Sequence, residues 1–117
     1  MQRILRATLN TWNGLVAAAR SEAAFRQELA ALVVAVPLAF LVATEPWKRG
    51  VLIAAVLLVL AIELLNTAIE KLCDEVTTAT NPAIGRIKDM GSAAVGVALV
   101  LAGLTWLVAL GERFGFW

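Results

Sequence analysis

The chain has 117 residues, enough for one domain, and 61% of them are hydrophobic; with glycine included, the apolar share is about 68%, against about 45–50% in soluble domains. This composition excludes an ordinary soluble domain and indicates a membrane protein. Charged residues make up only 16% of the chain and leave a formal net charge of +1, so no overall positive field would attract nucleic acid.

The first predicted element is an amphipathic helix over residues 3–19. Polar side chains recur at helical spacing along one face (Arg3, Arg6, Asn10 and Asn13), and apolar ones follow the opposite face (Leu5, Leu9, Trp12 and Val16). Such a helix lies in the membrane interface, with its arginines at anionic head groups. The first residues lack the apolar core and cleavage site of a signal peptide, so we expect none of them to be removed.

Three membrane-spanning helices are predicted at residues 23–44, 49–75 and 86–111, all within a single membrane domain, 1–117. Crossing a hydrocarbon core about 30 Å thick takes about 20 helical residues. Only the third span contains a charge-free stretch of that length; the first must tolerate Arg26 and Glu28 near its end, and the second must carry Glu63 and Asn66. Pro37 predicts a kink in the first span, compensated by neighbouring helices.

The distribution of cations predicts the orientation of the chain. Three spans put the two termini on opposite sides of the membrane. The N-terminal side would hold most of the cations (Arg3, Arg6, Arg20, Arg26, Lys71, Arg86 and Lys88), and the other side the remainder (Lys48, Arg49 and Arg113). The richer side should be cytoplasmic, so we expect a cytoplasmic N-terminus.

The second span carries a stripe of polar residues. Glu63, Asn66, Glu70 and Asp74 recur at i, i+3, i+7 and i+11, which aligns them along one narrow helix face. A carboxylate among leucines at the depth of Glu63 costs about 3 kcal/mol or more, so a functional role is expected for it. The alternative is a hydrogen-bonded carboxyl that fixes helix register. For Asp74, an interfacial anchor is an equal alternative.

Further charged residues gather at the same cytoplasmic interface: Glu22 opens the first span, and Lys88 and Asp89 open the third. With no histidine and a single cysteine, Cys73, the chain lacks the usual zinc and iron–sulfur ligands, so any metal is a hard cation such as Mg²⁺ held by carboxylates. Carboxylates beside a lysine suit Mg²⁺–nucleotide binding. Helix capping by Glu22, and interfacial anchoring by Lys88 and Asp89, remain alternatives.

Three strings together resemble one family: EAAFRQE at 22–28, ELLNTAIEKLCD at 63–74 and KDMGSAA at 88–94. They are similar to the small integral-membrane diacylglycerol kinases of bacteria, a family that includes undecaprenol kinases. The resemblance covers essentially the whole chain. It implies a homotrimeric bundle of three-span protomers that transfers the γ-phosphate of ATP to a membrane lipid alcohol, with active sites shared between protomers.

The resemblance also implies roles for individual residues. Glu63 would be the general base, and Glu22 and Glu70 would hold Mg²⁺. The nucleotide would bind near Arg3, Glu22, Asn66, Glu70, Asp74, Lys88 and Asp89, and the lipid substrate near Arg3, Arg26, Gln27, Glu28, Glu63, Ser92 and Trp106. One departure is Asn10, where the family carries an aromatic residue, because an amide does not offer adenine the same stacking surface.

The sequence therefore predicts an ATP-dependent lipid kinase of the bacterial inner membrane that phosphorylates the primary hydroxyl of diacylglycerol to give phosphatidic acid. One alternative is an undecaprenol kinase of the same family. The other is a non-enzymatic oligomer, a channel or assembly protein, whose intramembrane carboxylates line a pore.

Overall fold

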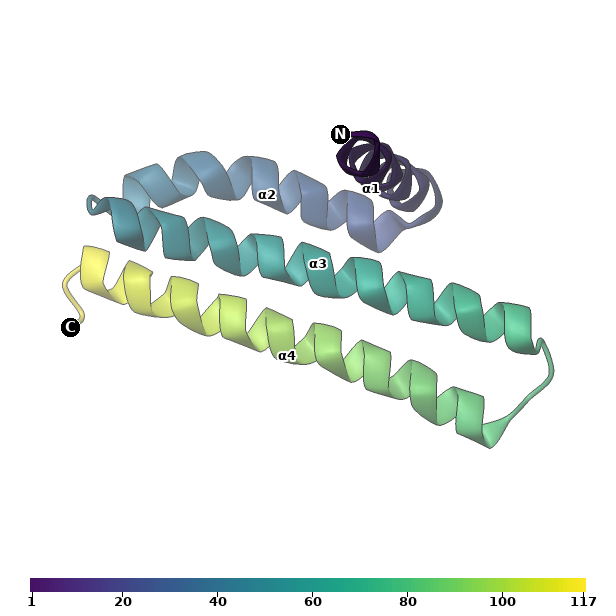
Figure 1. Cartoon of the computed structure of the whole chain (residues 1–117). Helices are drawn as coiled ribbons and strands as arrows, with labels where there is room; N and C mark the ends of the chain where they lie inside the picture. Colours follow the sequence, from purple (N-terminus) through teal and green to yellow (C-terminus); the bar gives the residue numbers. More distant parts are fainter.

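The computed structural model describes all residues, 1–117, and contains four helices and no strand: α1 (Gln2–Ser21), α2 (Ala23–Val42), α3 (Pro46–Val76) and α4 (Pro82–Arg113). The last three lie lengthwise side by side, and α1 crosses them steeply near the start of α2 (Figure 1). α2, α3 and α4 are each long and apolar enough to cross a membrane. The predicted fold class, an all-α membrane protein with three spans and an N-terminal amphipathic helix, is confirmed.

The helix boundaries follow from local sequence signals. α3 and α4 each begin at a proline, Pro46 and Pro82, which suits the first helical turn because its N–H would be unpaired there anyway. These prolines start the helices about one turn earlier than residues 49 and 86. Asn81 caps α4, since its side-chain oxygen accepts hydrogen bonds from the backbone N–H groups of Ala83 and Ile84. α2 continues past Pro37 as one helix and is bowed in Figure 1.

The three long helices form a single flat layer with α3 in the middle. α3 packs against both α2 and α4, whereas α2 and α4 contact each other little. The molecule measures 53 × 42 × 21 Å, and only 16 of its 117 residues are buried. Half of these lie on α3. Burial within one copy of the chain is therefore concentrated on α3.

Two small apolar clusters join the helices. Ala18 of α1, Phe25 of α2 and Leu60 of α3 form the first, with Phe25 only 1% exposed. Arg26 strengthens this junction because its guanidinium donates to the carbonyls of Ala19 (2.9 Å) and Arg20 (3.3 Å), which end α1 without helical partners. α1 is thereby held at the end of the bundle where α2 begins (Figure 1). We call this the inner end, and the opposite end, where α2 ends, the outer end.

The second cluster lies at the opposite, outer end. It consists of Ala39 and Ala43 of α2 and Leu52 of α3, with Trp106 of α4 packed against it. The Trp106 indole N–H donates to the Leu52 carbonyl over 3.1 Å. This contact fixes the spacing of α3 and α4 near the outer end.

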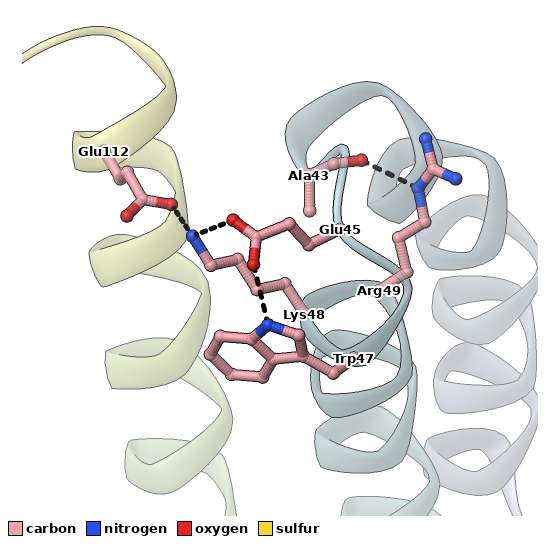
Figure 2. Close-up of polar contacts among 6 residues, drawn as sticks. All are labelled: Ala43, Glu45, Trp47, Lys48, Arg49 and Glu112. Atoms are coloured by element: carbon pink, nitrogen blue, oxygen red, sulfur yellow. Dashed lines mark hydrogen bonds and ion pairs between the residues drawn. The ribbon is translucent and has the colours of Figure 1, made fainter.

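Ion pairs tie the α2–α3 loop to the end of α4 (Figure 2). The Lys48 ammonium lies 2.5 Å from the Glu112 carboxylate and 3.1 Å from that of Glu45. Glu45 also accepts a hydrogen bond of 2.7 Å from the Trp47 indole. All four side chains are at least partly exposed, so the network fixes geometry more than it adds stability.

Two arginines satisfy the last carbonyls of α2. Arg49 donates to the Ala43 carbonyl over 2.8 Å, and Arg113 donates to that of Leu41 over 3.3 Å. These are groups that a helix C-terminus leaves without intrahelical partners. The cations of the outer end are therefore all engaged by the protein itself.

The last residues fold back on α4. Gly115 adopts a φ of +80°, which glycine reaches without strain, and the Phe116 N–H then donates to the Gly111 carbonyl over 2.8 Å. The Trp117 indole donates to the Val108 carbonyl over 2.9 Å, and its ring lies where a Gly111 side chain would be. Trp117 and Trp47 give the outer end two exposed tryptophans, as expected at a membrane–water interface.

The outer network predicts a pH dependence of stability. Hydrogen bonds from Lys48 and Trp47 hold the pKa of the Glu45 carboxyl below its ordinary value of 4.5. The ionised carboxylate therefore stabilises the fold above that value, and the contribution is lost as the pH falls through the lowered pKa. We expect Glu45→Gln to lower the Tm in detergent at neutral pH, and the difference from wild type to vanish in acid. Thermal unfolding across the pH range checks this, and a constant difference would contradict it.

Candidate functional site

Glu63 is the centre of the polar region on α3. Glu63 is 8% exposed and lies one helical turn after the buried Leu60. Its carboxylate makes no hydrogen bond within the chain. Glu22 and Glu70 lie within electrostatic reach of it, and so does Glu28. Four carboxylates from the start of α2 and the inner half of α3 thus surround one region. The alternative of a hydrogen-bonded carboxyl that fixes register is not observed within the chain.

Asn66 follows Glu63 along α3 and is 7% exposed. Its side-chain amide N–H donates to the Glu70 carboxylate over 3.2 Å. The bond joins two residues of the predicted stripe and orients the carboxylate of Glu70. The Oδ1 atom of Asn66 is buried and has no hydrogen-bond partner.

Glu22 joins α1 to α2 and is held by a lysine of α3. Its backbone is extended, and its side chain makes no capping hydrogen bond, so the capping alternative is not observed. The Lys71 ammonium lies 3.5 Å from the Glu22 carboxylate and 3.2 Å from the Ser21 hydroxyl. Lys71 therefore brings Glu22 to the α3 side of the junction.

A second lysine links α3 to α4 at the inner end. Lys88 of α4 lies 2.7 Å from the Asp74 carboxylate of α3. Asp74 is close to the end of α3 and Lys88 close to the start of α4. In Figure 1 these ends of α3 and α4 extend past the start of α2. Asp89 and Arg3 are exposed and make no side-chain hydrogen bond within the chain, so the structure does not connect these two predicted residues to the others.

An apolar groove of about 470 Å³ runs along α2 and is bordered by one residue of α3 and one of α4. Gln27 and Trp106, both predicted near the lipid, line it together with aliphatic side chains of α2 and Val56 of α3. Glu28 follows Gln27 and has a buried Oε2 atom without a hydrogen-bond partner. Of the other predicted lipid-site residues, Arg26 caps α1, and Ser92 is exposed without a side-chain hydrogen bond.

A second groove, of about 420 Å³, separates α1 from α3. Asn10, Thr11 and Gly14 of α1 form one wall, and Thr67 and Lys71 of α3 belong to the other. Since Lys71 also contacts Glu22, this groove opens beside the carboxylate cluster. Its volume is within the range of small-molecule sites.

The carboxylates fit a divalent cation only in part. No three acidic or cysteine side chains of the chain come close enough together to enclose a metal ion. Oxygen-only donors are nevertheless what Mg²⁺ selects, and it commonly takes one or two carboxylates together with substrate phosphates and water. Glu22 and Glu70 are each held by a neighbour and suit that arrangement.

Sequence reasoning missed two residues of this region. Lys71 was assigned only to the cytoplasmic cations, although it pairs with Glu22. Gly91 was not singled out, although a side chain there would collide with Asn66. The sequence alone does not distinguish Gly91 from the other glycines of α4, because the glycine that faces the polar stripe is set by how the two helices pack.

The fold and the site define an integral-membrane protein that brings charged groups of its inner end to an apolar groove. The family model described as prokaryotic diacylglycerol kinase matches residues 9–110, and the chain belongs to this family. It is 43% identical over 113 residues to the diacylglycerol kinase of Escherichia coli strain K12, an alignment covering 97% of this chain and 93% of that protein.

Two further relatives carry the same name. The diacylglycerol kinase of Pseudomonas aeruginosa is 46% identical over 110 residues, covering 94% of this chain and 89% of the relative. That of Haemophilus influenzae is 36% identical over 106 residues, covering 91% and 90%. The predicted resemblance and the prediction of a lipid kinase are thereby confirmed, and the non-enzymatic channel or assembly protein is excluded.

The exposure of the Lys88–Asp74 pair predicts that it contributes little to folding. We expect Lys88→Met and Asp74→Asn each to lower the Tm in detergent no more than a control substitution at an unpaired acidic residue, because water screens the pair. Thermal unfolding measures this, with Glu75→Gln as a control at an exposed acidic residue that has no side-chain partner. A decrease in Tm clearly larger than that of the control would instead identify the pair as a structural link.

Proposed function

We propose that the protein transfers the γ-phosphate of ATP to the primary hydroxyl of diacylglycerol, giving phosphatidic acid and ADP, at the cytoplasmic face of the bacterial inner membrane. The observation that carries the proposal is the position of Glu63. It is a buried carboxylate without a hydrogen-bond partner, close to the other inner carboxylates and on the helix that borders the apolar groove. The names of the bacterial relatives support diacylglycerol as the substrate.

Glu63 acts as the general base in this reaction. The lipid hydroxyl oxygen attacks the γ-phosphorus, its proton passes to the Glu63 carboxylate, and the bond between the γ-phosphorus and the bridging oxygen of ADP breaks. Phosphoryl transfer depends mainly on positioning and charge neutralisation. A carboxylate with no partner of its own is available for the incoming hydroxyl.

The apolar groove along α2 receives the acyl chains of the lipid. Gln27 and Trp106 line it, and Glu28 follows at its inner end beside Glu63. A lipid lying there would have its glycerol hydroxyl at the polar end of the groove. We extend the lipid site to Arg3, Arg26 and Ser92 on the resemblance to the family.

The nucleotide binds on the inner side of the carboxylates. Its phosphates face Lys88, and Arg3, Asn66, Asp74 and Asp89 border them. The groove between α1 and α3 has room for the adenosine moiety and opens beside Glu22. Its wall carries Asn10 in place of an aromatic residue, so polar contacts replace stacking on the base.

Glu22 and Glu70 would hold the Mg²⁺ that accompanies ATP. When bound, the ion would neutralise charge on the phosphates. Lys71 and Asn66 hold these two carboxylates in position by an ion pair and a hydrogen bond.

The protein acts as a homotrimer with shared sites. The flat layer leaves most apolar side chains exposed, which suits contact with lipid and with further copies of the chain. Arg3, Asp89 and Ser92 have no side-chain partner within one chain, which suits a role at a neighbouring protomer's site. The distribution of cations supports a cytoplasmic N-terminus.

The role of Glu63 predicts a large loss of activity for a nearly isosteric change. We expect Glu63→Gln to lower the rate about 10²- to 10⁴-fold, because the amide cannot accept the proton, with the fold unchanged. Transfer of radiolabelled phosphate from ATP to lipid in mixed micelles measures this.

The assay is run with diacylglycerol and with undecaprenol side by side. Glu75→Gln serves as the matched control, since Glu75 directly follows the last residue of the polar stripe on α3 and is exposed. Near-wild-type activity of Glu63→Gln would refute the assignment of the base, and phosphorylation of undecaprenol alone would refute the substrate.

Shared sites predict recovery of activity when two inactive variants are mixed. We expect Glu63→Gln and Asp89→Asn to be inactive separately and to regain a measurable fraction of the wild-type rate after subunit exchange in detergent. Some mixed trimers then contain a site with both carboxylates. Differently tagged chains verify the exchange, and a complete lack of recovery would mean that each protomer carries its own site.

A further inference from the structure

Gly91 of α4 lies directly against Asn66 of α3. A Cβ atom built on Gly91 would be 2.2 Å from the Asn66 Oδ1 atom and 3.3 Å from its Cγ atom. The same atom built on Gly85, Gly96 or Gly103, on the same helix, meets nothing within 4 Å. Within the chain, a Cβ atom at Gly91 would therefore force its neighbour to move, whereas a Cβ atom at those three glycines would not.

The Asn66 side chain is oriented by this contact. It is 7% exposed, its Oδ1 atom faces Gly91 without a hydrogen-bond partner, and its Nδ2 atom donates to Glu70 over 3.2 Å. Only the NH₂ end of an amide can donate to a carboxylate. The space at Gly91 thus accepts the carbonyl end and leaves the donating end directed at Glu70.

We infer that Gly91 is a positioning residue for the divalent-cation site. By leaving room for the Oδ1 atom of Asn66, it holds the amide in the one orientation that fixes the Glu70 carboxylate. Gly91 itself touches no substrate. The inference rests on the proposed function in one respect, the assignment of Glu70 to the Mg²⁺ that accompanies ATP.

A methyl group at position 91 has two ways to be accommodated. Either Asn66 rotates away, which breaks its bond to Glu70, or α4 moves outward, which separates the two helices at this level. The interior is packed too closely to absorb an overlap of this size without such a shift. Both movements disturb the carboxylate, so the substitution should affect cation binding beyond its effect on folding.

The first experiment measures cation dependence. We expect Gly91→Ala to raise the Mg²⁺ concentration for half-maximal phosphate transfer about tenfold, the effect of losing a hydrogen bond to a charged group. Binding of Mn²⁺ together with a non-hydrolysable ATP analogue, followed by electron paramagnetic resonance, should weaken by the same factor. Gly96→Ala is the matched control, because it adds the same methyl group to the same helix in open space.

The second experiment tests the contact itself by a double-mutant cycle in thermal stability. We expect Gly91→Ala to lower the Tm in detergent by about 5 °C in the wild-type background. In the Asn66→Ala background the loss should disappear, because the atoms that the methyl group meets are gone. An equal loss in both backgrounds would overturn the inference, since the glycine would then serve general helix packing.

The outcomes separate the inference from the proposed function. A wild-type protein that phosphorylates no lipid would refute the function, while the Mn²⁺ measurement and the stability cycle would still test the role of Gly91. An active wild-type protein whose Gly91→Ala variant keeps the same Mg²⁺ dependence and Mn²⁺ affinity would overturn the positioning role and leave the function standing.

Discussion

The burial of a carboxylate and an amide in an otherwise aliphatic helix is the constraint on which the arrangement of this protein depends. Glu63 and Asn66 are both less than one-tenth exposed. A helix that carries such groups at membrane depth cannot face lipid with them, because hydrocarbon offers no partners. α3 accordingly occupies the middle of the layer, flanked on one side by α2 and on the other by α4.

The two ends of the layer treat their polar groups differently. At the outer end, each of the cations Lys48, Arg49 and Arg113 is bound to a carboxylate or a backbone carbonyl of the protein. At the inner end, Glu63 and one oxygen each of Glu28 and Asn66 have no partner in the chain. Buried acceptors without partners are costly, so they are typical of sites built to receive something else. The cations of the outer end are thus all paired, whereas the inner end keeps unpaired acceptors, which supports the proposal that the site lies there.

Much of this could be predicted from the sequence. The alternation of charge-free stretches with Pro-containing loops indicated three long helices, and the spacing of residues 63, 66, 70 and 74 indicated one polar helix face. Helix starts were predicted about one turn late, because Pro46 and Pro82 were interpreted as loop residues although proline suits a first turn. The periodicity of side chains along one helix depends only on residues close together in the sequence, so it can be recognised without knowing how the helices pack.

Contacts between helices could not be predicted in the same way. The pairing of Lys71 with Glu22 joins residues far apart in the chain and depends on how α1 turns into α2. The fit of Asn66 against Gly91 depends on the distance between two helix axes, which no spacing in the sequence encodes. The three strings that resemble the family predicted candidate site residues, whereas the packing shows how some of them are held.

The unequal lengths of the helices connect this protein to the thickness of its membrane. α2 has 20 residues and is about 30 Å long, which just matches a typical hydrocarbon core, whereas α3 and α4, with 31 and 32 residues, exceed it by about 17 Å. With tryptophans at the outer end, the excess emerges at the inner end. A bilayer that thins or thickens changes the tilt of such helices. Hydrophobic mismatch would therefore change the depth of Glu22, Glu28 and Glu63 relative to the glycerol region of the lipids. The choice of lipid hydroxyl near these carboxylates would then depend on bilayer thickness as well as on the chemistry of the lipid.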